Sequence, residues 1–158
     1  MSIFDMLEYK NGELYWTSNA SVKMRGKLAG SLNNRGYRKI EINGKKYGAH
    51  QIVFALHNGY IPEVLDHINN NPSDNRIENL RAATKSENGY NRKQILSNTS
   101  GAKNVSYRQD TNKWRVDIRI DGKPFCFGSY DDFDLADLVA TEARNKYHGQ
   151  FKNHGDLA

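Results

Sequence analysis

The sequence contains a single cysteine, Cys126, among its 158 residues. One cysteine excludes an intramolecular disulfide framework and a zinc site built from several cysteines. Long apolar runs are also missing, since no stretch approaches the roughly 20 residues that a membrane-spanning helix needs. The N-terminus lacks the charged-then-apolar order of a secretory signal. We therefore expect a soluble, cytoplasmic chain with no membrane partner.

Apolar residues make up 37% of the chain, which is low for one large core, whereas aromatic residues at 11% favour folding. The length predicts one domain or two very small ones. The sequence shows no internal repeat and no low-complexity tract.

The net charge of +5 is unevenly distributed. Residues 1–50 carry nine Lys and Arg against four Asp and Glu, and residues 98–130 carry six against three. The segment between them is neutral, and residues 131–158 are acidic. Basic surface in a soluble chain points to a polyanion, most often nucleic acid. Ordinary solvated charge explains the composition equally well.

Asparagine is in surplus: the chain has 18, of which nine lie from Asn58 to Asn98. Surplus asparagine usually marks turns. Its amide can also hold a metal ion or orient a histidine, so the neighbouring residues must decide between these roles.

The first half of the chain predicts short elements. Apolar alternation and the Asn43-Gly44 hairpin signal favour strands at residues 13–16, 37–42, 45–49, 63–67 and 79–83. Helices are expected over 49–58, ended by Gly59, and over 87–92, capped by Thr84 or Ser86. Residues 68–76, rich in Asn, Pro, Ser and Asp, are expected to form a loop.

After a polar stretch at 94–100, the second half predicts three antiparallel strands and one helix. The strands are expected at residues 104–108, 113–120 and 123–130, and the helix at 131–148. In the middle strand, Trp114, Val116 and Ile118 alternate with charged residues. We expect the apolar face to pack on Ala136, Ala140 and Ala143 and the charged face to point outward.

Four polar residues in the centre form the most informative set in the chain: Asp66, His67, Asn79 and Asn88. Carboxylate and amide oxygens suit Mg²⁺ in phosphodiester chemistry. A histidine beside such a ligand can take a proton from an attacking water near neutral pH. Asn79, on the facing strand, is placed to hydrogen-bond across the hairpin and fix its geometry.

These segments resemble HNH endonucleases of the phage homing type, over about residues 36–92. The matching residues are Ala49-His50-Gln51-Ile52-Val53-Phe54, Asp66-His67-Ile68-Asn69-Asn70-Asn71, Asp74 to Arg81, and Thr84 to Asn91. Asn69 and Asn70 depart from the Asp and Gly that are common there.

The resemblance implies a ββα-metal fold with Mg²⁺ or Mn²⁺ as cofactor. It makes His67 the general base, Asn79 the residue that orients it, and Asp66 and Asn88 the metal ligands. His50 is either a phosphate contact or a locally packed residue. Arg76, Arg81 and Arg92 either clamp phosphate or are surface charge. Turn formation is the expected role of four others, namely Asn69, Asn70, Asn71 and Asn75.

The C-terminal unit resembles the AP2 DNA-binding domain over about residues 99–151. The matching residues are Gly101-Ala-Lys-Asn-Val105, Lys113 to Arg119, Gly122-Lys123, Phe127 to Tyr130, three helix alanines and His148-Gly149. Asn104 and Ser106 depart from the usual pattern in the first strand. The resemblance implies that the outward sheet face reads DNA, with Arg115 and Arg119 as base or phosphate contacts. The strand pattern adds as further candidates Lys113 on the same face, Lys103, Tyr107 and Arg108 on the first strand, and Lys123 near the hairpin. The alternative is a charged face that is only solvated.

We therefore predict an α+β protein. Residues 1–93 form an HNH nuclease domain, 94–100 a linker, and 101–158 an AP2-like DNA-binding domain. The predicted activity is site-specific cleavage of double-stranded DNA by a monomer or homodimer, in the host cytoplasm if a phage encodes it, with no protein partner evident. The rival hypotheses are a non-catalytic DNA-binding regulator and an HNH nuclease of low specificity.

Overall fold

The structure is a computed structural model that describes residues 3–94 and 97–155. It is a mixed α/β chain with several small antiparallel sheets and few helices, compatible with the α+β class. Backbone contacts divide it into two compact units, residues 1–83 and 84–158. None of the helices in the described part combines the length and apolar character that a membrane span requires.

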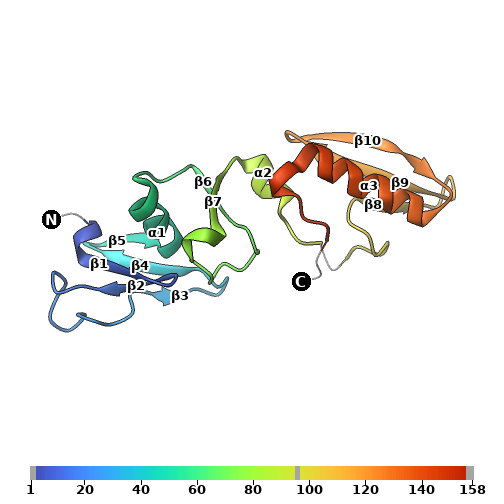
Figure 1. The fold of residues 1–158 in the computed structure, drawn as a ribbon. Helices are drawn as coiled ribbons and strands as arrows, with labels where there is room; N and C mark the ends of the chain where they lie inside the picture. The colour runs from blue at the N-terminus through green and yellow to red at the C-terminus, as the bar shows by residue number, and fades with distance from the viewer. Residues whose placement is uncertain (1–2, 95–96, 156–158) are drawn as a thin grey trace. The chain divides into compact units, whose positions relative to one another are not determined.

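The first unit begins with two small sheets (Figure 1). After the 3-10 turn η1 (Ile3–Met6), β1 (Leu7–Lys10) pairs with β2 (Glu13–Trp16). β3 (Ser31–Leu32), β4 (Arg38–Ile42) and β5 (Lys45–Gly48) form the second sheet. The predicted turn at Asn43-Gly44 is confirmed, because both residues have positive φ as a two-residue hairpin requires. The sequence patterns did not predict β1 and β3.

Helix α1 (Ala49–Asn58) has the predicted bounds and ends at Gly59, whose φ is 77°. It contacts β2, β4 and β5, and its apolar side packs into the core of this unit (Figure 1). The most deeply buried core residues are Leu14, Ala29, Ile40 and Val53. This packing fixes the start of α1, where His50 lies.

The antiparallel hairpin of β6 (Val64–His67) and β7 (Leu80–Ala83) carries several of the predicted site residues. Both strands lie within one residue of the expected ranges. The loop from Ile68 to Arg76 and the 3-10 turn η2 (Ile77–Asn79) join them. Asn70 turns the loop with a φ of 58°, as expected for a turn-forming asparagine.

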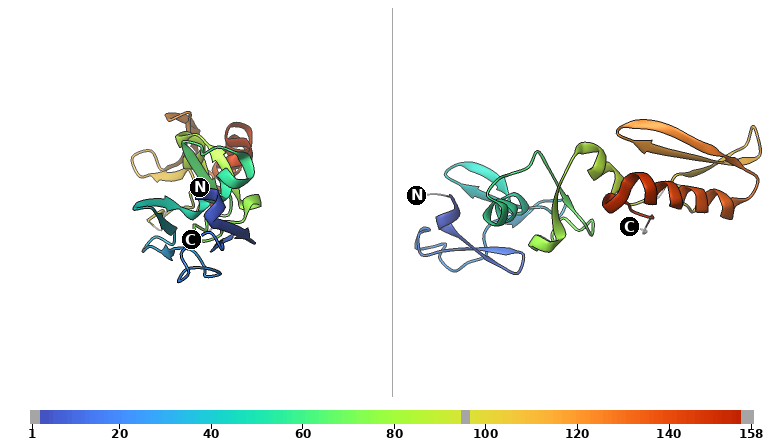
Figure 2. Two further views of the ribbon diagram at one scale, coloured as in Figure 1. Left: turned by 90° about the vertical axis from the view of Figure 1, so that its left-hand side faces the viewer. Right: turned by 45° about the horizontal axis from the view of Figure 1, so that its top comes forward.

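The second unit contains a three-stranded antiparallel sheet in the order β10-β9-β8. Its strands are β8 (Val105–Arg108), β9 (Lys113–Ile120) and β10 (Lys123–Tyr130), and α3 (Phe133–His148) lies along one face (Figure 2). α3 starts two residues after the predicted position because Asp132 is its N-cap. Val116 and Ile118 are buried against the helix alanines, which confirms the predicted apolar face.

The second unit also includes α2 (Lys85–Tyr90) and η3 (Gly149–Phe151), which contact each other. Of the two candidate caps, Thr84 is the cap of α2, since its Oγ1 accepts the Glu87 amide at 3.2 Å. The predicted nuclease domain, residues 1–93, extends beyond the division at Ala83 and stays a prediction. Within the predicted linker at 94–100, residues 95–96 lie outside the described residues.

Candidate functional site

Asp66 and His67 end β6 and are both buried, with 4% and 6% of their surface exposed. Antiparallel register places Arg81 of β7 directly opposite Asp66. Arg81 donates from Nε and Nη2 to Asp66 Oδ2 at 2.8 and 2.7 Å. A buried carboxylate is costly without such a partner, so the ion pair with Arg81 offsets the cost of burying Asp66 and fixes its orientation.

His67 is oriented by Asn75, which is only 2% exposed. The distance from His67 Nε2 to Asn75 Oδ1 is 3.1 Å. Because an amide oxygen can only accept, Nε2 is the nitrogen that carries the proton and the neutral ring has its lone pair on Nδ1. Asn75 was expected to form a turn, so its contact with His67 is a role that sequence reasoning missed.

Asn79 acts on the loop that carries Asn75. Its Oδ1 accepts the Asn69 amide at 3.0 Å, and its Nδ2 donates to Asn69 Oδ1 at 2.9 Å and to the Asp74 carbonyl at 2.8 Å. These three bonds close the loop across the hairpin, as the position of Asn79 predicts. Asn79 thus supports His67 through the loop and Asn75, whereas direct orientation of the base by Asn79 stays a prediction.

The exposed side of the loop is fixed by an ion pair. Arg76 donates to both carboxylate oxygens of Asp74 at 2.8 Å. The Arg76 guanidinium holds the pKa of Asp74 well below its ordinary value. Asn69 and Asn71 accept backbone amides two residues ahead, which confirms them as turn formers. Phosphate binding by Arg76 remains a prediction.

His50 lies in the first turn of α1 with its ring beside that of His67. The two ring centroids are 5.4 Å apart, and the Tyr37 ring lies 5.6 Å from His50 and 5.9 Å from His67. A Cβ at Gly48 would meet the His50 ring at 2.5 Å, so a side chain there would force the ring to shift. Burial, with smaller contributions from His67 and Lys39, lowers the pKa of His50 to about 4. His50 is therefore neutral at physiological pH.

Asn88 lies on α2, in the second unit, so its pairing with Asp66 at one metal ion stays a prediction. The described residues contain no cluster of three or more His, Cys, Asp or Glu side chains that could hold a metal ion. Asp66 and Asn88 both offer oxygen donors, which fit a hard cation such as Mg²⁺. With only two protein ligands, the other coordination positions of such an ion would be open to water and phosphate oxygens.

Comparisons with known proteins identify a relative of this chain. The chain is 39% identical to Protein 3.8 of Escherichia phage T7 over 106 residues, which is 65% of this chain and 85% of that protein. The chain belongs to the family of phage T7 Protein 3.8.

In this Protein 3.8 family member, residues 47–90 match the HNH endonuclease family. The matched range includes Asp66, His67, Asn79 and Asn88, and also His50 and Asn75. The match suggests a nuclease whose substrate is DNA and whose chemistry uses a divalent metal. No solved structure matches the chain.

Outside the HNH match, the Protein 3.8 family member has a sheet face that points away from α3. On β9, Arg115 donates to Asp117 at 3.0 Å, which raises the pKa of Arg115, while Arg119 is exposed and donates to the Gly122 carbonyl. Lys113 lies 3.4 Å from Asp131. Four further residues that are predicted to contact DNA are exposed: Arg92, Tyr107, Arg108 and Lys123.

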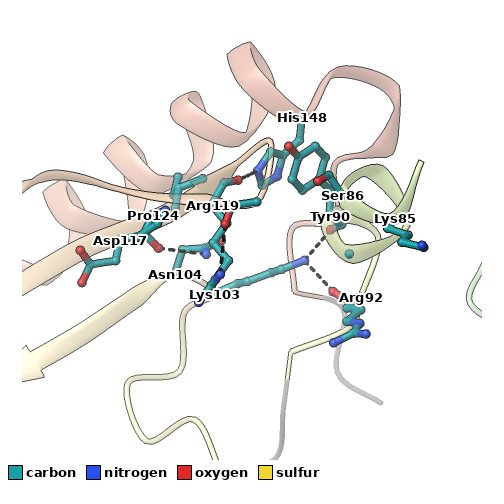
Figure 3. Close-up of a pocket in the computed structure, with 13 residues that line it drawn as sticks. Lys85, Ser86, Tyr90, Arg92, Lys103, Asn104, Asp117, Arg119, Pro124 and His148 are labelled. Atoms are coloured by element: carbon teal, nitrogen blue, oxygen red, sulfur yellow. Dashed lines mark hydrogen bonds between the residues drawn. The ribbon is translucent and has the colours of Figure 1, made fainter. Parts of the chain in front are cut away.

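Lys103 is in a different environment. Its ammonium donates to the carbonyl oxygens of Tyr90, Arg92 and Asn153 at 3.0, 2.6 and 3.0 Å. It also lines an open pocket of about 590 Å³ between α2, β9 and the end of α3 (Figure 3). A DNA contact through Lys103 remains a prediction, whereas its backbone contacts are a structural feature that the sequence did not reveal.

Proposed function

We propose that this protein is a site-specific DNA endonuclease of the homing type, acting in the host cytoplasm, with His67 as its general base. The observation that carries the proposal is the pair at the end of β6. Asp66 is held by Arg81, and the adjacent His67 is held by Asn75, inside the range that matches HNH endonucleases.

In this proposal, His67 removes the proton from the water that attacks the scissile phosphorus. The hydrogen bond from Nε2 to Asn75 supports the role, because it places the ring proton on Nε2 and the lone pair of the base on Nδ1. Asn75 and the loop closed by Asn79 keep the ring in one orientation during the transfer. Asn79 is thus a positioning residue.

Asp66 and Asn88 would hold a Mg²⁺ or Mn²⁺ ion through oxygen atoms. When bound, the ion supplies charge stabilisation to a phosphate oxygen and to the leaving 3′ oxygen. Arg81 donates to Asp66 and fixes the direction of its carboxylate, a role that favours metal binding.

The AP2-like sheet would supply DNA recognition. The face of β9 opposite α3 presents Arg115 and Arg119, and arginine reads guanine edges or phosphates through paired donors. Lys113 and Lys123, together with Tyr107, Arg108 and Lys103, are the remaining proposed contacts of this unit. The proposed contacts from the HNH segment are His50, Arg76, Arg81 and Arg92. Contacts to phosphate make the affinity depend on salt.

The test is digestion of a phage-sized, linear double-stranded DNA with the full-length protein, in Mg²⁺ and in EDTA. On a denaturing gel, which reveals single-strand as well as double-strand breaks, we expect discrete bands in Mg²⁺ and uncut DNA in EDTA. A smear in Mg²⁺ would favour a nuclease of low specificity, and DNA that stays uncut but is bound would favour a regulator. Sequencing the cut ends then shows whether one strand or both are cut. A monomer would nick, whereas double-strand cleavage needs a homodimer or two successive events.

A further inference from the structure

Helix α2 has only six residues and carries the predicted metal ligand Asn88. A helix of this length is not stable alone, because nucleation costs more than its few hydrogen bonds return. Its capping box, in which Thr84 and Glu87 accept each other's backbone amides, fixes only the first turn. The end of α2 must therefore be held by contacts with the rest of its unit.

Tyr90, the last residue of α2, makes the first of these contacts. It is 7% exposed, and its ring stacks on that of His148 with centroids 3.8 Å apart and planes 5° from parallel (Figure 3). Its hydroxyl accepts the Asp121 amide at 2.6 Å. Tyr90 thus joins α2 both to the end of α3 and to the β9–β10 turn.

His148 is itself fixed in this position. Its Nε2 lies 2.9 Å from the Arg119 carbonyl on β9, so this nitrogen carries the proton. Burial lowers the pKa of His148, and the charges of Lys103 and Arg144 act in the same direction. The neutral ring under Tyr90 is therefore a packed support and carries no charge at neutral pH.

Lys103 makes the second connection, from the loop before β8. Its ammonium binds the Tyr90 and Arg92 carbonyls at the end of α2 (Figure 3). It also binds the Asn153 carbonyl. Arg144 of α3 donates to the Lys103 carbonyl and is only 1% exposed. A cation that satisfies the last carbonyls of a helix also opposes the negative end of its dipole.

We propose that Tyr90, Lys103 and His148 are positioning residues for Asn88, through which the DNA-recognition unit holds the metal-binding helix. We call these three residues the α2 anchor. The inference rests on the proposed function, since it gives Asn88 its role as a ligand. It implies that the recognition sheet and one metal ligand move as one body, so DNA bound on the sheet sets where the metal ligand is presented.

The test measures Mn²⁺ binding to the full-length protein. The electron paramagnetic resonance signal of free Mn²⁺ reports how much of the ion is unbound. Lys103→Met removes the ammonium at nearly constant length, and Lys152→Met is the matched control on an exposed residue of the same unit. We expect the Mn²⁺ dissociation constant to rise about tenfold in Lys103→Met, as for other residues that support a metal ligand, and to be unchanged in the control.

Amide hydrogen exchange of the same variants separates positioning from general unfolding. In Lys103→Met the Asn88 and Asn91 amides, which bond within α2, should exchange about tenfold faster while Val116 and Ile118 stay protected. Tyr90→Phe should shift both readouts in the same direction by less, since it keeps the stack and removes the hydroxyl. Its control is the exposed Tyr147→Phe.

Unchanged Mn²⁺ affinity in Lys103→Met would overturn the proposal, and so would unchanged exchange in α2 or absence of Mn²⁺ binding to the wild type. Neither readout requires cleavage. A wild type that binds Mn²⁺ through an anchored α2 and yet cuts no DNA would contradict the proposed function alone.

Discussion

At the scale of single residues, the site is a set of buried polar groups that each have a partner. Asp66 has Arg81, and His67 has Asn75. Unpaired, these groups would cost folding free energy, because burial removes their hydrogen bonds to water. The pairing thus explains how the chain tolerates a carboxylate and an imidazole at 4% and 6% exposure at the end of a short hairpin.

Asn75→Ala should slow DNA cleavage about tenfold to a hundredfold without weakening DNA binding, because it frees the His67 ring to rotate away from the water. The measurement is the single-turnover rate beside a binding assay. Asn71→Ala, in the same loop and exposed, is the control. Equal rates for both variants would mean that Asn75 does not orient the base.

His50 gives a prediction on pH. Its pKa is about 4 in the folded chain and near 6.5 when unfolded, so the unfolded chain binds the proton more readily. Unfolding free energy should fall as the pH drops from about 6.5 towards 4, by about 1–3 kcal/mol at the acidic end. Above a pH of about 6.5, His50 is neutral in both the folded and the unfolded chain, so none of this unfolding free energy is lost.

Urea denaturation of the metal-free protein at several pH values checks this prediction. His50→Gln should have a flatter profile than the wild type over this window. The ring signals of His50 in NMR spectra should titrate near pH 4. A titration near the ordinary value, or identical profiles for the two proteins, would contradict the burial of a neutral His50.

At the scale of elements, the β6–β7 loop is organised by one side chain. Asn79→Ala removes three hydrogen bonds, which join Asn79 to Asn69 and Asp74. We expect a loss of about 2–3 kcal/mol in unfolding free energy, measured by urea denaturation. Asn145→Ala on α3, which removes a single long bond to Glu142, should cost little. A loss below about 0.5 kcal/mol for Asn79→Ala would show that the loop closes without it.

Local patterns made many of the elements predictable. Alternation indicated β9, the Asn-Gly pair indicated the hairpin at 43–44, and Gly59 indicated the end of α1. β3 could not be predicted in this way, because its two residues are a strand only through pairing with β4. The roles of Asn75 and Lys103 also depend on partners that no local pattern identifies.

The candidate site was also predictable in part from local patterns, and in part it depends on partners that are distant in the sequence. The spacing of Asp66, His67, Asn79 and Asn88 was visible in the sequence, and all four lie within the range that matches HNH endonucleases. The sequence left Arg81 open between a phosphate contact and surface charge, and it gave no sign of the ion pair with Asp66 that the structure shows. Strand register creates that pairing, and the order of residues along the chain does not reveal which of them lie opposite each other.

At the scale of the whole molecule, DNA affinity should depend on the β9 face. Arg115→Ala with Arg119→Ala should weaken DNA binding and reduce the slope of log affinity against log salt by about 1 for each phosphate that is no longer neutralised. Lys146→Ala on α3 is the control. The measurement is fluorescence anisotropy of labelled DNA at several salt concentrations. Equal affinities and equal salt slopes for the double variant and the wild type would contradict the recognition role.

The role of His67 as general base is tested most sharply by the cleavage activity of His67→Ala, measured together with its DNA binding. We predict that in Mg²⁺ the wild type cuts and the variant does not, with a rate loss of about a hundredfold or more, while both bind DNA equally. Cleavage by His67→Ala at the wild-type rate would contradict this assignment.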